Sequence, residues 1–139
     1  NQNKFEDMHY MFQKEFGQRL SSGTRSKSYG RLSVLTQYMT KVLSLFVVNP
    51  ESFKPVPAVE SIFIKLTPIA ERDIDSPTAK KLQEITQIAF SKRRKMLSKS
   101  YKDILGKEDF NYLNIESSQR PEDLTVEEFV RISDFLIQN

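Results

Sequence analysis

The sequence predicts two parts of different class, an α/β part followed by an all-helical part. Three observations indicate this order. Before residue 70, short runs rich in β-branched and aromatic residues alternate with helix-like segments. Prolines then stand at positions 68 and 77, and beyond them apolar residues recur about every 3.6 positions. We therefore expect the α/β part to cover residues 1–70 and the helical part residues 71–139 of the 139-residue chain.

The α/β part contains three predicted strands and two predicted helices. Strands are expected over residues 8–12, 42–48 and 61–67, and helices over residues 14–20 and 31–39. In the second helix Leu32, Leu35 and Met39 recur at the i, i+3, i+7 spacing of an amphipathic face. Three strands in so short a segment, opening directly on a strand, indicate the end of a larger sheet. We therefore expect the chain to be a fragment of a longer protein.

The helical part is expected to begin with one long helix, or two abutting helices, from residue 77 to about residue 104. Ser76 can cap such a helix, with Pro77 in its first turn. The apolar residues that repeat along it are Leu82, Ile85, Ala89 and Met96.

Two further helices are expected near the end of the sequence. A short one is expected over residues 108–113. Thr125 and Glu128 have the spacing of a capping box, which predicts the start of the last helix. Its apolar face contains Phe129, Ile132 and Leu136.

The residue types that are missing exclude several classes of site. The chain has no Cys and one His, which excludes disulfide frameworks, thiolate metal sites, cysteine nucleophiles and His-based zinc sites. Its four glycines form no phosphate-binding loop, and no serine has a base to activate it. No apolar run reaches the roughly 20 residues that cross a bilayer, and the first residues are polar. We therefore expect a cytoplasmic protein without a metal, in which His9 is a core or edge residue rather than a catalyst.

The net charge of +3 hides a strongly uneven distribution along the chain. Residues 80–102 contain eight basic residues and one acid, a net charge of +7, whereas residues 103–139 carry a net charge of −6. The central basic residues are Lys92, Arg93, Arg94 and Lys95, followed by Lys99 and Lys102. On a helix these cations would form a ridge suited to phosphate, since Arg grips it bidentately and Lys adds a point charge. The alternative is a solvated helix face whose Lys stems cover apolar surface.

A second candidate site is the segment between the second and third predicted strands. Pro55 and Pro57 exclude a helix there and stiffen the chain beside Phe53. An aromatic side chain held in this way can stack on a base that has been extruded from its helix. The alternative is that Phe53 fills the core and the prolines form a rigid connection.

Five segments together resemble one enzyme family. They are residues 11–20 (MFQKEFGQRL), 28–34 (SYGRLSV), 53–61 (FKPVPAVES), 89–97 (AFSKRRKML) and 120–125 (RPEDLT). In this order and spacing they resemble the ribosomal RNA adenine N6-dimethyltransferases of the KsgA type, over nearly the whole chain. The resemblance implies an S-adenosylmethionine-dependent enzyme that dimethylates N6 of two adjacent adenosines in small-subunit ribosomal RNA. Its partner would be the assembling small ribosomal subunit, with no membrane and no metal involved.

The resemblance also implies which half of the enzyme this chain corresponds to. Members of this family have a Rossmann-like methyltransferase domain followed by a small helical domain, and they are about twice this length. Their cofactor-binding and catalytic motifs precede the position that matches Asn1. Residues 1–70 are therefore expected to be the C-terminal part of the methyltransferase domain, and residues 71–139 the RNA-contacting domain. No catalytic or cofactor-binding residue is expected in this chain, which we expect to be inactive by itself.

By the same resemblance, roles can be assigned to particular residues. Phe53 is expected to stack on the target adenine, in a base-pocket loop that includes Pro55 and Pro57. The expected RNA contacts are Lys92, Arg93, Arg94, Lys95, Lys99 and Lys102. Ala58 stands where the family usually has Lys, and Glu60 replaces the usual Asp, which puts the ion pairing of this loop in doubt. Lys92 and Lys99 replace uncharged family residues and increase the positive charge.

Two other classes of protein remain as alternatives. One is a methyltransferase-like transcription factor of the mitochondrial type, which has this fold and binds DNA. The segments YGRLS (residues 29–33) and RRK (residues 93–95) favour the enzyme. The other is an RNA-binding helical module with no enzyme attached.

Overall fold

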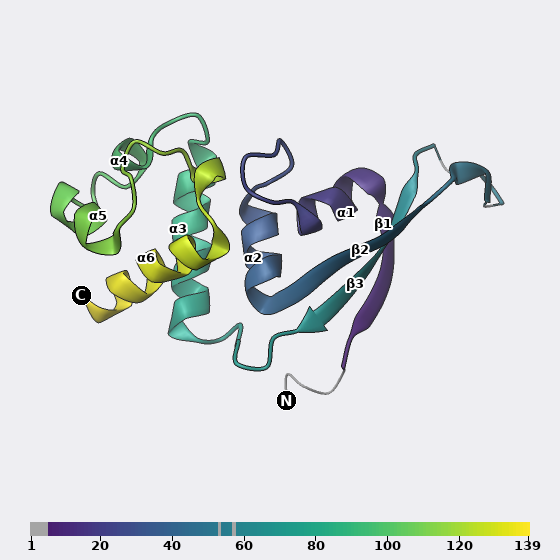
Figure 1. Ribbon diagram of the computed structural model, residues 1–139, viewed down its shortest axis with the longest axis horizontal. Coiled ribbons are helices and arrows are strands. Elements are labelled where there is room, and N and C mark those ends of the chain that lie inside the picture. The colour runs from purple at the N-terminus through teal and green to yellow at the C-terminus, as the bar shows by residue number, and fades with distance from the viewer. Residues whose placement is uncertain (1–5, 53, 57) are drawn as a thin grey trace.

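The computed structural model describes residues 6–52, 54–56 and 58–139, which contain three strands and six α-helices (Figure 1). The first part of the chain forms β1 (Met8–Gln13), α1 (Lys14–Ser21), α2 (Arg31–Met39), β2 (Thr40–Val48) and β3 (Ser61–Pro68). The second forms α3 (Pro77–Ser91), α4 (Leu97–Ser100), α5 (Lys107–Leu113) and α6 (Val126–Gln138). Short 3₁₀ turns lie at Pro50–Ser52 and Pro121–Asp123. No helix in these ranges is long and apolar enough to span a membrane. The fold is mixed α/β, as the sequence predicts.

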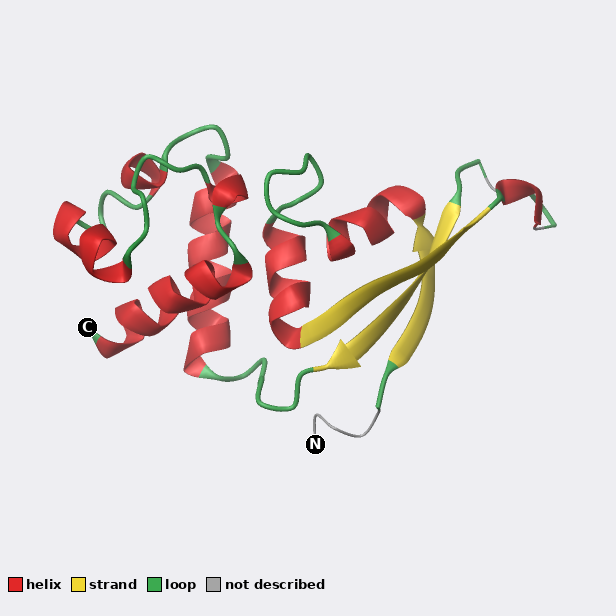
Figure 2. Ribbon diagram, viewed as in Figure 1, coloured by secondary structure: helices red, strands yellow, loops and turns green. Residues whose placement is uncertain are grey.

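The three strands form an antiparallel sheet in the order β1-β3-β2, with α1 lying against it (Figure 2). Ile62 and Ile64 of the central strand are buried together with Leu20 of α1. Gly17 lets α1 approach this closely, because a Cβ atom there would overlap Cγ2 of Ile62 and lie 3.0 Å from Cδ1 of Ile64. The absence of a side chain at position 17 therefore sets the distance between α1 and the sheet.

His9 lies on β1, where it pairs in register with Lys65 of β3. Its side chain is 54% exposed, and its Nε2 atom lies 3.4 Å from Oδ1 of Asp7. Within the described residues β1 is an edge strand of the sheet. Among the described strands, His9 therefore lies at an edge of the sheet.

The main core joins the helical part to α2. Buried side chains of α3 and α6 pack with Val34 and Tyr38 of α2 and with Tyr29, which precedes it. The Tyr29 hydroxyl donates a hydrogen bond to the carbonyl of Leu124 at 2.6 Å. α2 accordingly lies beside α3 (Figure 1). The division at residue 70 stays a prediction, and the core crosses it.

The prediction that the first helix of the second part continues through the cations is wrong. α3 ends at Ser91, and residues 92–96 form a turn before α4. The cause is distant in sequence. The buried Leu97 donates its backbone N–H to the carbonyl of Gln119 at 2.8 Å, and Ser98 donates to Ser117 at 3.0 Å. A continued helix would take these two N–H groups away from that segment. Met96, expected on the apolar stripe with Ala89, is instead 39% exposed.

The predicted helix starts are confirmed. The Ser76 hydroxyl accepts a hydrogen bond from the N–H of Ala79 at 3.1 Å, with Pro77 as the first residue of α3. Thr125 and Glu128 form the capping box of α6, each accepting the other's backbone N–H, at 3.1 and 3.0 Å. Each of these helix starts depends on residues only three positions apart, so it does not require contacts with distant parts of the chain.

Candidate nucleic-acid interface

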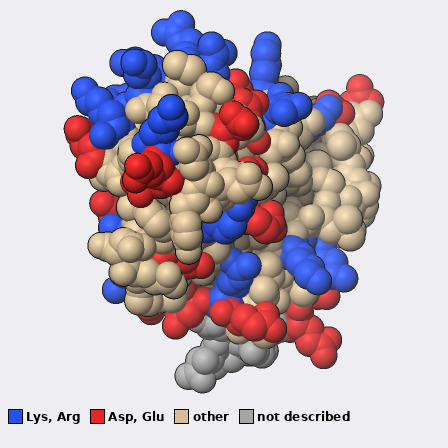
Figure 3. All heavy atoms as spheres, turned by 60° about the vertical axis from the view of Figure 1, so that its left-hand side comes forward, with Lys and Arg blue, Asp and Glu red and all other residues tan. Residues whose placement is uncertain are grey.

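The four consecutive cations Lys92, Arg93, Arg94 and Lys95, here called the basic turn, lie between α3 and α4. Lys92, Arg94 and Lys95 are exposed, and their side chains form no ion pair or hydrogen bond with the part of the chain that the structure describes. Lys99 and Lys102 follow and are exposed as well. Figure 3 shows Lys and Arg side chains gathered along the upper edge of this face. Because residues 92–95 form a turn, the charged groups of Lys92, Arg94 and Lys95 all reach solvent. On a single helix, consecutive side chains would not all lie on one exposed face.

Arg93 differs from its neighbours because it is already engaged within the protein. Its Nη2 atom lies 3.6 Å from Oε2 of Glu122 and donates to the carbonyl of Lys27 at 3.2 Å. A longer contact of 3.4 Å reaches the carbonyl of Ser26. Its guanidinium also lies 5.8 Å from the ring centre of Phe90. Arg93 therefore fastens residues 26–27 to the end of α3 and to the 3₁₀ turn at Pro121–Asp123.

Replacing Arg93 with Ala should therefore loosen residues 21–30. Hydrogen bonds from a charged donor contribute about 1.5–3 kcal/mol each when well formed, and the partial exposure of Arg93 reduces this to an expected loss of about 1 kcal/mol. Trypsin should cleave after Arg25 and Lys27 faster in this variant. Arg94→Ala is the matched control and should leave both the unfolding midpoint and the cleavage rate unchanged. Equal cleavage in the two variants would show that Arg93 does not hold this loop.

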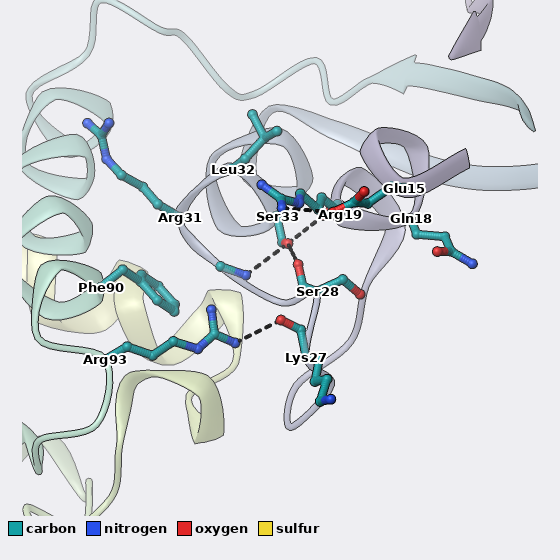
Figure 4. A pocket seen from close by; sticks show the side chains of 11 residues that line it. Glu15, Gln18, Arg19, Lys27, Ser28, Arg31, Leu32, Ser33, Phe90 and Arg93 are labelled. Atoms are coloured by element: carbon teal, nitrogen blue, oxygen red, sulfur yellow. Dashed lines mark hydrogen bonds and ion pairs between the residues drawn. The ribbon is translucent and has the colours of Figure 1, made fainter. Parts of the chain in front are cut away.

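A hollow of about 580 Å³ lies next to the basic turn, between α1, the start of α2 and the end of α3 (Figure 4). Four cations line it, from four different segments: Arg19, Lys27, Arg31 and Arg93. Glu15 is the only acid among its described lining residues, and it pairs with Arg19 at 3.2 Å. Phe90 forms part of the wall beside Arg93. The hollow is therefore cationic, with one aromatic surface.

The start of α2 faces this hollow without a side-chain cap. Its N-cap is Gly30, which has no side chain to accept from the first N–H groups of the helix. The N–H of Gly30 donates to the Ser33 hydroxyl at 3.1 Å, and that hydroxyl donates to the carbonyl of Arg19. These bonds fix the turn into α2 and tie it to α1.

The sequence reasoning missed Arg19, Lys27 and Arg31 as members of a site. A signal was present, because residues 19–31 contain four cations and no acid. The net charge of +7 over residues 80–102 is larger, and it drew attention away from this shorter run. Only the fold shows that both runs meet at one place, where Arg93 contacts residues 26–27.

The base-pocket loop is described only in part. Phe53 and Pro57 lie outside the described residues, so the stacking role of Phe53 and the loop role of Pro57 stay predictions. Pro55 is exposed between β2 and β3. Glu60, at the end of the loop, forms an ion pair with Lys14 at 3.1 Å. The replacement of Asp by Glu at this position is therefore compatible with an ion pair.

No group of three or more His, Cys, Asp or Glu side chains that could hold a metal occurs in the described ranges. Two buried tyrosines have strongly perturbed hydroxyls. Burial raises the pKa of Tyr29 and of Tyr101 well above the ordinary value, and the nearby Glu127 and Glu128 add to the effect on Tyr29. Both hydroxyls are hydrogen-bonded, Tyr29 to Leu124 and Tyr101 to the carbonyl of Ile85 at 2.8 Å. Their role is structural.

Comparison with solved structures defines the class of fold. The chain is similar to a dimethyladenosine transferase from Plasmodium falciparum, with a TM-score of 0.79 and 22% identity, over 95% of this chain and 57% of that one. It is also similar to the 23S rRNA methyltransferase ErmE, with a TM-score of 0.69 and 20% identity, over 98% of this chain and 57% of that one. The chain thus has the fold of the matching part of these two transferases.

Sequence comparison then gives the family. A family model described as ribosomal RNA adenine dimethylase matches residues 1–138, and this chain belongs to that family. A relative from Marinomonas sp., named ribosomal RNA small subunit methyltransferase A, is 45% identical over 96% of this chain and 50% of its own length. A relative of the same name from Colwellia psychrerythraea is 36% identical over 98% of this chain and 45% of its own length. The chain spans about half the length of these curated relatives.

Proposed function

We propose that this chain is the C-terminal half of an S-adenosylmethionine-dependent enzyme that dimethylates N6 of adjacent adenosines in small-subunit ribosomal RNA. The observation that carries the proposal is the family match over residues 1–138, together with relatives named as small-subunit methyltransferases of about twice this length. In this proposal the chain supplies the last strands of the catalytic domain and the surface that holds RNA on the assembling subunit.

The described residues do not fit the cofactor. A sulfonium nucleoside of this kind is bound by a glycine-rich turn between a strand and a helix. Gly17 lies inside α1 against the sheet, Gly30 and Gly106 begin helices that follow loops, and Gly23 lies in an exposed loop. We therefore assign no step of methyl transfer to residues of this chain and place the cofactor site in the other half of the enzyme.

The part of the proposal that concerns the cofactor can be tested by calorimetry and by a methylation assay. Titration of the 139-residue chain with S-adenosylmethionine should give no binding heat, and the chain should transfer no methyl group to undermethylated small subunits. The full-length enzyme should do both. Measurable cofactor binding by this chain would contradict the proposal, and unmodified adenosines with the full-length protein would favour the transcription-factor alternative.

The RNA-binding part of the proposal is carried by the basic turn. Arg94 and Lys95 are exposed and free to contact phosphates, and each phosphate contact contributes about 0.7–0.9 to the slope of log affinity against log salt concentration. Arg94→Gln with Lys95→Gln should therefore lower the slope for a small-subunit RNA hairpin by about 1.4–1.8. Lys80→Gln with Lys107→Gln is the matched control, because it removes two exposed charges elsewhere. Equal slopes for the two double variants would contradict an RNA contact at the basic turn.

A further inference from the structure

We propose that the cationic hollow between α1, α2 and the end of α3 is a phosphate-binding subsite that receives one phosphodiester group of the bound RNA. This inference rests on the proposed function, since it takes RNA as the ligand. It adds to that function a second point of contact, where residues of the first part of the chain meet Phe90 and Arg93 of the second part. The side chains that would bind the phosphate are those of Arg19, Lys27 and Arg93.

The charge balance of the hollow leaves positive charge unmatched. Two of its four cations have acidic partners, Arg19 with Glu15 at 3.2 Å and Arg93 with Glu122 at 3.6 Å. Lys27 is exposed, and its side chain has no partner within the described ranges. The Lys27 ammonium is therefore a positive charge at the hollow that no described acid balances. An anionic group is the ligand that such a site attracts.

The basic side chains at the hollow differ in direction. Figure 4 shows Arg93 extending toward Lys27, with Phe90 beside it, while the Arg31 guanidinium points away. Arg31 instead donates to the carbonyl of Gln83 at 3.1 Å. Arg31 lines the hollow at the first turn of α2, whose N-cap Gly30 has no side chain to cap it. The positive end of the helix dipole adds to the attraction of an anion there.

The position of the hollow favours RNA as the source of the phosphate. Arg93 belongs to the basic turn and also lines the hollow, so the hollow is adjacent to the two cations, Arg94 and Lys95, that the proposed function assigns to RNA phosphates. The volume of about 580 Å³ is within the usual range of 300–1,000 Å³ for ligand sites, so a nucleotide unit can enter it. Phe90 offers an aromatic surface to the sugar or base of that unit. A free phosphate ion would use the same donors but not this surface.

The test uses the 139-residue chain, with backbone amide NMR shifts and salt-dependent RNA binding as readouts. Inorganic phosphate and a small-subunit RNA hairpin are titrated separately. With either probe, the amides of residues 30–33 should shift in the wild-type chain, and less in Lys27→Gln. Lys27→Gln should also lower the salt slope for the hairpin by about 0.7–0.9, whereas Lys80→Gln should leave the slope unchanged. Arg93 is left intact because its loss would also loosen the loop.

The outcomes separate this inference from the proposed function. If Arg94→Gln with Lys95→Gln lowers the slope but Lys27→Gln does not, and the amides of residues 30–33 stay still, RNA binds without the hollow and the inference is overturned. If these amides shift with inorganic phosphate but not with the hairpin, the site takes free phosphate, and the RNA assignment is overturned. If the wild-type chain binds no hairpin at all, it is the proposed function that fails.

Discussion

Alanine at position 17 is expected to lower the free energy of unfolding by about 1–3 kcal/mol. Two effects oppose each other here. Inside a helix, replacing Gly with Ala gains roughly 0.5–1 kcal/mol. The new methyl group, however, would overlap Cγ2 of Ile62, which belongs to a β-branched side chain on the central strand and cannot rotate away. Because α1 or β3 must shift as a whole, the overlap outweighs the gain.

The matched control for this substitution is Gly23→Ala, in the exposed loop after α1. A Cβ atom there meets nothing within 4 Å, and the backbone of Gly23 does not have a positive φ. We expect a change of at most about 0.5 kcal/mol, or a small gain from restricting the unfolded chain. Urea unfolding of the two variants measures the difference. If both variants unfold at the same midpoint, the close packing of α1 on the sheet would be contradicted.

A rise from pH 9 to pH 11 is expected to cost roughly 3 kcal/mol of stability through two buried tyrosines. Burial raises the pKa of Tyr29 and Tyr101 in the folded chain above the value of 10.0 that they have when exposed. The contribution of these hydroxyls is therefore complete below pH 10. It is lost as the pH rises from 10 toward the folded pKa, because the unfolded chain releases the two protons first. Each tyrosine then costs about 1.4 kcal/mol per pH unit.

Unfolding by urea between pH 8 and pH 11 tests this expectation. Tyr101→Phe should remove about half of the dependence above pH 10, and at neutral pH it should cost about 0.5–1.5 kcal/mol for the lost bond to Ile85. Tyr112→Phe is the control, since this side chain is 79% exposed. A wild-type chain equally stable at pH 9 and pH 11 would mean that neither hydroxyl is protected by the core.

The elements could be predicted from sequence wherever the signals were local. Helix α2 has the predicted bounds, and the starts of α3 and α6 follow from Ser76 with Pro77 and from Thr125 with Glu128. The end of α3 could not be predicted, because no Gly or Pro marks it. It depends on bonds from the backbone of residues 97 and 98 to residues 117 and 119, about twenty positions away.

The candidate site was predictable only where its charges are contiguous. Residues 92–95 form an unbroken run of cations, whereas Arg19 and Lys27 belong to a looser run, residues 19–31, in which four cations are spread among uncharged residues. The different role of Arg93 was also hidden from the sequence. It depends on the carbonyls of Ser26 and Lys27 and on Glu122, which only the fold brings to the end of α3.

The core that joins α2 to the helical part has a mechanical consequence. Tyr29, Val34 and Tyr38 are buried with α3 and α6, whereas α1 and the sheet form a separate, smaller buried cluster. If the molecule flexes, α2 should therefore travel with the helices after residue 76, although it precedes β2 and β3 in the chain. The boundary between the two clusters then lies between α1 and α2 and at the start of β2 as well as in the linker at residues 69–76, and the hydrogen bond from Ser33 to the carbonyl of Arg19 crosses it. Residues on both sides of this boundary line the cationic hollow, so movement of α2 relative to α1 would change the width of that hollow.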